Sequence, residues 1–189
     1  LVDDQDLTVR VKPRPDLQVD AINIPDEVPA GGTLTIQFVI INQGQVATTT
    51  PNWSDRVYLS LDTTITTDDI LIGTFGNNSA LAHGERYTTT TPAFTIPQRL
   101  RGNVYIIVQT DALQGVEEWP NDGNNIRYEP IFVEPLPLAD LVVENVVAPA
   151  QAIEEATIEV RYTVTNRGSG TTNVPTWNDT IWLTRDKNR

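Results

Sequence analysis

Acidic side chains gather in two turn-like stretches of the sequence, and oxygen ligands for a hard cation are the chemistry they could supply. The first stretch, "DTTITTDD" at residues 62–69, offers Asp62, Asp68 and Asp69 among threonine hydroxyls. Calcium takes roughly six to eight oxygen ligands of this kind. The stretch does not have the spacing of an EF-hand loop. The same residues are also typical of an ordinary turn, in which Asp and Thr satisfy backbone groups.

The second acidic stretch is "DALQGVEEWPNDGNN" at residues 111–125. Its candidate ligands are Asp111, Glu117, Glu118, Asp122 and Asn124. In an immunoglobulin-like topology the two stretches lie at opposite ends of one domain, so they cannot share an ion within it. An ion could instead lie at a junction between repeats, with Asp62, Asp68 and Asp69 on one side and Asp179 on the other. Calcium is the one cofactor this sequence suggests, and ordinary turns are the alternative.

Catalytic residues are sparse. Cysteine is absent, and the single histidine, His83, stands in the turn-like "LAHGE". A Ser-His-acid triad would need a recognisable nucleophile turn, and the sequence contains none. We therefore expect His83 to be an exposed turn residue and the protein not to be an enzyme.

Tryptophans near polar residues suggest either packing or sugar binding. Trp53 and Trp119 fall on segments that should share one end of the domain, close to Asn124 and Asn125. An exposed pair of indoles would resemble a sugar-binding surface. Burial in the core or packing between repeats, which would also involve Trp177, is the alternative because an indole favours burial with its N–H satisfied.

These residues belong to a repeat with an offset of 124 positions. "NWSDRVYLSLD" at residues 52–62 returns as "TWNDTIWLTRD" at residues 176–186, and Trp53 becomes Trp177. The apolar alternation of residues 34–40 returns at residues 158–164 even where the residue types change. The repeat predicts four parts of the chain. Residues 1–13 are the last strand of a preceding repeat plus a linker, and residues 14–134 are one complete repeat. Residues 135–139 are a proline-rich linker, and residues 140–189 are the front of a further repeat. The absence of Met fits a window cut from a longer array.

The complete repeat contains seven strand-like segments with turn residues between them. They span residues 16–24, 33–42, 55–62, 70–75, 85–96, 103–111 and 125–134. Pro130 should lie at an edge or a bulge because proline cannot donate to a ladder. This pattern predicts an all-β fold, a seven-stranded antiparallel immunoglobulin- or fibronectin III-like β-sandwich, repeated in tandem. Short proline-spaced linkers should make successive sandwiches a semi-rigid rod.

The order of these motifs resembles a known family. "PDLQVDAINIPDEVPAGGTLTIQFVIINQG", "WSDRVYLSLD", "DDILIGTF", "GNVYIIVQTD" and the closing "VEEWPNDGNN" are similar, in order, to the motifs of CARDB, the cell-adhesion-related domain of bacteria. In this family, acidic residues usually precede the final Asn pair, where this sequence has Pro120, Asn121, Asp122 and Gly123. The resemblance implies a fibronectin-like sandwich, tandem arrangement in large secreted or surface proteins, and no catalysis.

The composition of the chain limits the kinds of partner that it can bind. The formal net charge is −12, and no basic cluster occurs, which argues against nucleic acid and anionic membranes. We expect neighbouring repeats and other copies of the protein as partners, in a filament or homo-oligomer, with polysaccharide as a further possibility. The expected role is an extracellular or cell-surface stalk, spacer or filament unit in a bacterium. A carbohydrate-binding accessory module of a secreted hydrolase is the alternative.

Overall fold

The computed structural model describes residue 10 and residues 12–185 of the chain. The chain folds as two compact units, of which the first ends at Pro135 and the second begins at Leu136. The predicted strand of a preceding repeat falls outside the described residues except for Arg10.

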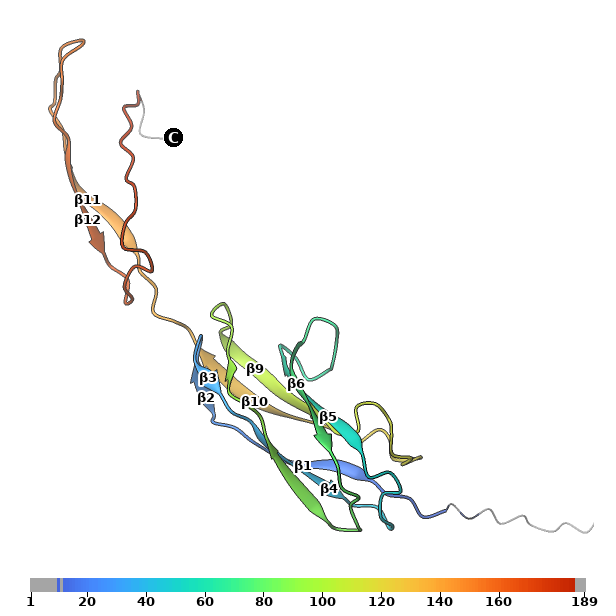
Figure 1. Ribbon diagram of the computed structural model, residues 1–189. Coiled ribbons are helices and arrows are strands. Elements are labelled where there is room, and N and C mark those ends of the chain that lie inside the picture. Colours follow the sequence, from blue (N-terminus) through green and yellow to red (C-terminus); the bar gives the residue numbers. More distant parts are fainter. Residues whose placement is uncertain (1–9, 11, 186–189) are drawn as a thin grey trace, which may run out of the picture. The chain divides into compact units, whose positions relative to one another are not determined.

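Two sheets form the first unit (Figure 1). The smaller sheet has the order β1-β4-β7 and consists of β1 (Leu17–Asn23), β4 (Gln37–Asn42) and β7 (Arg86–Thr90). The larger sheet has the order β2-β10-β9-β5-β6 and consists of β2 (Glu27–Pro29), β5 (Trp53–Ser60), β6 (Ile70–Asn77), β9 (Gly102–Gln109) and β10 (Ile126–Glu134). A short pair joins β3 (Thr33–Leu34) to β8 (Phe94–Thr95). The predicted all-β sandwich is confirmed.

The core consists of alternate side chains from the two sheets, as period-2 patterning requires. Ile36, Phe38 and Ile40 are fully buried on one side, and the inward residues of β9 are fully buried on the other. Phe38 meets Phe75 edge to face, with ring centroids 5.9 Å apart. The apolar alternation of residues 34–40 therefore places its side chains in the core.

The structure differs from the prediction in the number and the pairing of the strands. The segments predicted as single strands at residues 33–42 and 85–96 each divide in two, into β3 and β4 and into β7 and β8. The sequence did not reveal β2, which pairs with β10 in parallel through Phe132–Glu134 rather than antiparallel. After β1 the chain crosses from the smaller sheet to the larger one, because Pro25 interrupts the strand and β2 resumes at Glu27. At Pro130, strand β10 pairs with β9 alone, so the proline lies on an open edge as predicted.

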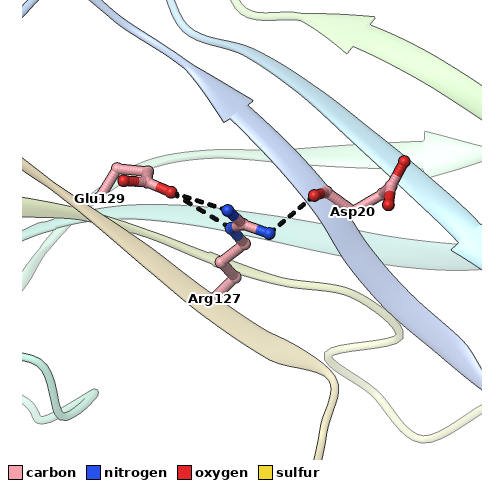
Figure 2. Close-up of polar contacts among 3 residues, drawn as sticks. All are labelled: Asp20, Arg127 and Glu129. Carbon is pink, nitrogen blue, oxygen red and sulfur yellow. Dashed lines mark hydrogen bonds and ion pairs between the residues drawn. The ribbon is translucent and has the colours of Figure 1, made fainter.

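Arg127 links the first strand of the smaller sheet to the last strand of the larger one (Figure 2). Its Nη1 donates to the Asp20 carbonyl of β1 at 2.7 Å, and its Nη2 lies 3.0 Å from a Glu129 carboxylate oxygen on β10. The guanidinium fork suits two acceptors held in fixed positions. The strand that enters the domain is thereby tied to the strand that leaves it.

The second unit repeats the first pair of strands. It contains β11 (Leu141–Val147) and β12 (Arg161–Asn166), which begin and end 124 residues after β1 and β4. The register repeats too: Leu17 pairs with Asn42, and Leu141 pairs with Asn166. Both pairs have an irregularity near the middle of the first strand. The same sequence pattern thus produces the same local structure twice.

An asparagine and a glycine shape the corner after β4. Asn42 Oδ1 accepts the N–H groups of Asp16 and Gly44, each at 3.0 Å, and its Nδ2 donates to the Val46 and Leu81 carbonyls. A Cβ at Gly44 would overlap the backbone of Arg14 and Pro15. Asn166 likewise accepts N–H groups from Asp140 and Gly168 in the second unit. The side chain of the asparagine replaces the backbone partners that a regular strand would supply.

Replacing Asn42 with alanine should destabilise the first unit. The substitution would leave four backbone groups without this partner, three of them in buried hydrogen bonds, so we expect a loss of about 2 to 4 kcal/mol in the free energy of unfolding, measured by urea denaturation. Asn23→Ala is the matched control, because the hydrogen bond from Asn23 to Gln37 is exposed and its loss should change stability by less than about 0.5 kcal/mol. Equal effects of the two substitutions would contradict the role assigned to the corner.

Candidate functional site

The segment between β9 and β10, residues 110–125, forms one end of the first unit together with the start of β5. Arg56, near the start of β5, lies opposite Gln109, and Ser60 lies opposite Tyr105. The loop after β5, residues 61–69, therefore lies at the other end. The two acidic stretches are separated within the domain, as the topology predicts.

A carboxylate is buried at this end of the sandwich, where alternation would place an apolar residue. Asp55 on β5 is 1% exposed. Tyr87 Oη donates to Asp55 Oδ2 at 2.5 Å, and Thr110 Oγ1 donates to Asp55 Oδ1 at 2.8 Å. Trp53 Nε1 in turn donates to Tyr87 Oη at 2.9 Å. The chain of donors joins the two sheets around one carboxyl group.

Burial shifts the pKa values within this network. Desolvation raises the pKa of Asp55 from 3.8 to about 6, although the hydrogen bonds from Tyr87 and Thr110 oppose the shift. Desolvation, with the nearby Asp55 charge, also raises the pKa of Tyr87 well above its usual value. The phenol therefore remains a hydrogen-bond donor, which is the role the buried carboxyl group needs.

Asp111 organises the beginning of the segment. Its two carboxylate oxygens accept the N–H groups of Gly115 and Val116, each at 2.8 Å. Asp111 and Gln114 both have positive φ, at 42° and 54°, a conformation that Asp adopts more often than most residues do. The carboxylate serves as a turn partner for the backbone.

Glu118 fastens the start of β1 to this segment. Its side chain is 1% exposed and accepts the Leu17 N–H at 2.5 Å and the Asn125 amide at 2.6 Å. Burial raises the pKa of Glu118 from 4.5 to about 7, against the lowering effect of these hydrogen bonds. A cavity of about 30 Å³, bordered by Glu118, Asp122 and Asn125 among others, has room for little more than one water molecule.

Two further contacts hold the residues just before β1. Asn124 Nδ2 donates to Asp16 Oδ1 at 2.9 Å, and Arg14 forms an ion pair with Glu117. The closing Asn pair of the motif thus binds the chain's own entry segment, since Asn124 holds Asp16 and Asn125 holds Glu118. We call this set, Arg14, Asp16, Glu117, Glu118, Asn124 and Asn125, the entry clamp.

The predicted calcium ligands of the loop after β5 make local contacts. Asp62 Oδ1 accepts the Thr64 N–H and Asp69 Oδ2 accepts the Thr66 N–H, each at 2.7 Å, while Asp68 N lies 3.4 Å from Thr66 Oγ1. Asp179 belongs to the second unit, where Tyr162 donates to it at 3.1 Å. Among residues 10 and 12–185, no three His, Cys, Asp or Glu side chains are placed to hold a metal ion. Calcium binding stays a prediction.

The tryptophans lie in different environments. Trp53 is 5% exposed within the core, whereas Trp119 is 62% exposed and Trp177 is 48% exposed. Trp53 and Trp119 therefore do not form the exposed pair that a sugar-binding surface would require. Burial follows from the position of Trp53 on an inward-facing site of β5, with its N–H satisfied by Tyr87.

His83 lies in an exposed turn, with Nδ1 2.5 Å from the Gly44 carbonyl oxygen. Asp55, Tyr87 and Arg127 are structurally important residues that the sequence motifs do not single out. A signal for Asp55 was present, because it alternates with Val57 and Leu59 on one face and recurs as Asp179. A carboxylate at an inward position predicts a buried polar network.

Comparison with known proteins identifies the fold. The CARDB family model matches residues 14–129. The chain belongs to the CARDB family. CARDB domains are a non-catalytic, adhesion-related type of domain, and the resemblance seen in the sequence is confirmed. No curated protein sequence matches the chain.

A solved CARDB domain shares this fold. A crystal structure of the CARDB domain of the PF1109 protein from Pyrococcus furiosus, in complex with di-metal ions, has a TM-score of 0.51 and 22% identity, covering 67% of this chain and 99% of that chain. The solution structure of the same domain has a TM-score of 0.48 and 23% identity, covering 64% of this chain and 96% of that chain. At this identity the likeness shows the fold alone.

The described residues do not fit a di-metal centre. The buried carboxylates Asp55, Asp111 and Glu118 each accept at least two hydrogen bonds from donors of the chain itself, and they do not gather into a cluster of three that could hold a metal ion. This end of the sandwich therefore holds the entry segment of the chain in place.

In the same described region, no helix is long and apolar enough to span a membrane.

Tyr87→Phe tests the Asp55 network. The substitution removes the donor to Asp55 and the acceptor for Trp53 Nε1, so we expect a loss of about 2 to 3 kcal/mol in the free energy of unfolding. The matched control is Tyr162→Phe, which removes an exposed hydrogen bond and should cost less than about 0.5 kcal/mol. Urea denaturation followed by tryptophan fluorescence measures both. An unchanged urea midpoint for Tyr87→Phe would contradict a stabilising role for the hydrogen bonds around Asp55.

The pH dependence of stability tests Glu118. Between about pH 4.5 and about pH 7 the folded state holds a proton on Glu118 that the unfolded state has released, so stability falls as the pH rises through this window. Asp55 adds a similar fall in stability between pH 3.8 and about pH 6. Glu118→Gln should therefore remove the fall in stability above about pH 6 and make the fall between about pH 4.5 and about pH 6 shallower, leaving the contribution of Asp55. Urea midpoints measured across this range give the result, and a wild-type midpoint that rises with pH would contradict it.

Proposed function

We propose that this chain is a structural, adhesion-type segment of a bacterial surface or secreted protein, in which each CARDB sandwich acts as a spacer that withstands tension. The family supports an adhesion-related role. The proposal that the sandwich withstands tension rests on the contacts between the strands by which the chain enters and leaves it.

Entry and exit lie at opposite ends of the first sandwich. The chain enters beside residues 110–125, where Glu118 holds Leu17. It leaves at the end of β10, which starts next to that segment and runs for 9 residues, or about 30 Å. Tension applied through the chain would therefore pass along the long axis of this domain (Figure 1).

The pairing of β2 with β10 suits such tension. The two strands are parallel, so pulling the entry segment and the exit segment apart slides them along each other and strains their hydrogen bonds together. The Phe132 N–H to Asp26 and the Ala30 N–H to Glu134, each at 2.9 Å, flank this pair. Bonds strained together resist more force than bonds that break one at a time. Arg127 adds a second link between entry and exit strands.

The entry clamp would keep tension from peeling β1 away. Glu118, Asn124 and the Arg14–Glu117 ion pair attach the entry segment to the loop before β10. Force on Arg14 would thus reach the body of the sandwich before it reaches the ladder of β1 and β4. Residues 62–69 and a calcium ion are not needed for this role.

A spacer role also accounts for the composition and the repeat. A net charge of −12 favours solubility and discourages nonspecific association, and successive repeats would serve as further spacers along the protein. We place the protein outside the cell or on its surface, without catalytic activity. Antibodies against the chain should then label intact, unpermeabilised cells of the source organism.

Single-molecule force spectroscopy of the full chain tests the proposal. The first unit should give one unfolding event that releases on the order of 400 Å of chain, because each extended residue adds about 3.6 Å. Arg127→Ala should lower the unfolding force measurably while changing the equilibrium stability by less than about 1 kcal/mol, because the contact is solvent-exposed.

Arg161→Ala is the matched control for that experiment. Arg161 forms an exposed ion pair with Glu159 in the second unit, so its loss should leave the force peak of the first unit unchanged. An unfolding force indistinguishable from the instrument noise in the wild-type chain would overturn the spacer proposal.

A further inference from the structure

The sequence contains one Asp-Gly pair, Asp122–Gly123, and it lies in the segment between β9 and β10. Both residues are exposed, in a turn that the Asn124 N–H closes onto the Asn121 carbonyl oxygen at 3.4 Å. A hydrogen bond of this length is weak. The pair is therefore loosely held, although the segment around it is fastened by the entry clamp.

The Gly123 amide nitrogen is open to reaction. Among the residues that the structure describes, its N–H has no hydrogen-bond acceptor, and a Cβ built at this glycine would meet no atom within 4 Å. Glycine adopts backbone conformations that a side chain forbids elsewhere, so this nitrogen can reach the carboxyl carbon of Asp122. A nucleophile and an electrophile thus stand next to each other in the chain.

Attack of this nitrogen on Asp122 Cγ gives a cyclic imide. The new N–Cγ bond forms, and the carboxyl hydroxyl leaves as water together with the amide proton. Water can then open the imide at the main-chain carbonyl of Asp122, which breaks the original peptide bond and leaves a free α-carboxyl group. The product is isoaspartate, in which the chain continues through the side chain. The water lost in the first step is regained in the second, so mass, charge and oxidation state are unchanged.

The surroundings of Asp122 favour the neutral imide. Asp122 borders the small cavity shared with Asp111 and Glu118, and no Lys, Arg or His is among the described residues that line it. Burial raises the pKa of Asp111, and the charge of Asp122 adds to that rise. Like charges at such a site disfavour each other. Formation of the imide removes the charge of Asp122 and therefore relieves this repulsion.

Asp62 shows why the glycine matters. It also lies in an exposed turn, but the next residue is Thr63, whose stiff, branched side chain restricts the approach of the nitrogen. Asp62 Oδ1 also accepts the Thr64 N–H at 2.7 Å, which holds the carboxyl group in place. Exposure is common to the two aspartates, whereas the glycine that follows is specific to Asp122.

Isoaspartate at this position would act on the entry clamp. The turn lies between two fixed residues, because Asn125 Nδ2 donates to the buried Glu118 Oε2 at 2.6 Å. The isomer adds Asp122 Cβ to the main chain between them. The added length falls just before Asn124, whose Nδ2 donates to Asp16 Oδ1 at 2.9 Å. This contact is therefore the one that the isomer displaces.

We propose that Asp122 is a site of spontaneous isomerisation to isoaspartate and that the change releases Asn124 from Asp16. The buried contact of Glu118 with Asn125 stays, so the sandwich remains folded while the entry segment loses one of its attachments. The inference does not depend on the spacer role, because the reaction requires no tension.

Incubation of the full chain for several weeks in neutral buffer tests the inference. Isoaspartate is measured with a methyltransferase that is specific for isoaspartyl carboxyl groups and takes a labelled methyl group from S-adenosylmethionine, and peptide mapping locates the label. The label should accumulate severalfold faster at Asp122 than at Asp62. The urea midpoint of the aged chain should fall as the isomerised fraction grows.

Gly123→Ala is the decisive variant, because the structure has room for its methyl group. It should lower the rate at Asp122 severalfold, and its urea midpoint should not change with age. Gly76→Ala is the matched control, since a Cβ there also meets no atom within 4 Å but Gly76 follows Phe75, and it should isomerise like the wild-type chain. Equal labelling of Asp122 and Asp62, a wild-type rate in Gly123→Ala, or an unchanged midpoint of the aged wild-type chain would overturn the inference.

Discussion

The first unit depends on satisfying two buried carboxyl groups with hydrogen-bond donors of the chain itself. Asp55 and Glu118 are almost wholly removed from water, and each carboxyl group is stabilised by N–H or O–H donors of the chain. A buried polar group without such donors costs several kcal/mol. The positions of Tyr87, Thr110, Leu17 and Asn125 are therefore constrained by two carboxyl groups. The shape of the segment between β9 and β10 follows from that constraint.

The family and the sandwich could be predicted from the sequence because both depend on regular patterns. Alternation placed Ile36, Phe38 and Ile40 inward, and the recurring motifs established the repeat. The parallel strand β2 could not be predicted, since three residues between two proline turns have no period to detect. Its partner is chosen by the crossing of the chain between sheets, which is a tertiary property.

The candidate site was predicted only in part. The acidic stretch at residues 111–125 was recognised, yet its side chains bind backbone and amide groups of the same chain rather than a ligand. Sequence cannot distinguish these outcomes, because Asp and Asn are suitable both as metal ligands and as turn partners. The apolar outer face of the larger sheet was also not predicted. Tyr58, Tyr105 and Tyr128 occupy alternate positions expected to be polar, and only the register brings them into one surface.

The corner made by Asn42 and Gly44 has a consequence for where a domain of this kind begins. The Gln43 N–H donates to the Asp16 carbonyl at 2.7 Å and the Gln45 N–H donates to the Arg14 carbonyl at 3.1 Å, so residues ahead of the first strand supply acceptors to the corner. A shortened chain starting at Leu17 would keep every strand and still lose both acceptors. The independent folding unit therefore starts in the proline-rich stretch itself, and any dissection of a longer array should cut upstream of Arg14.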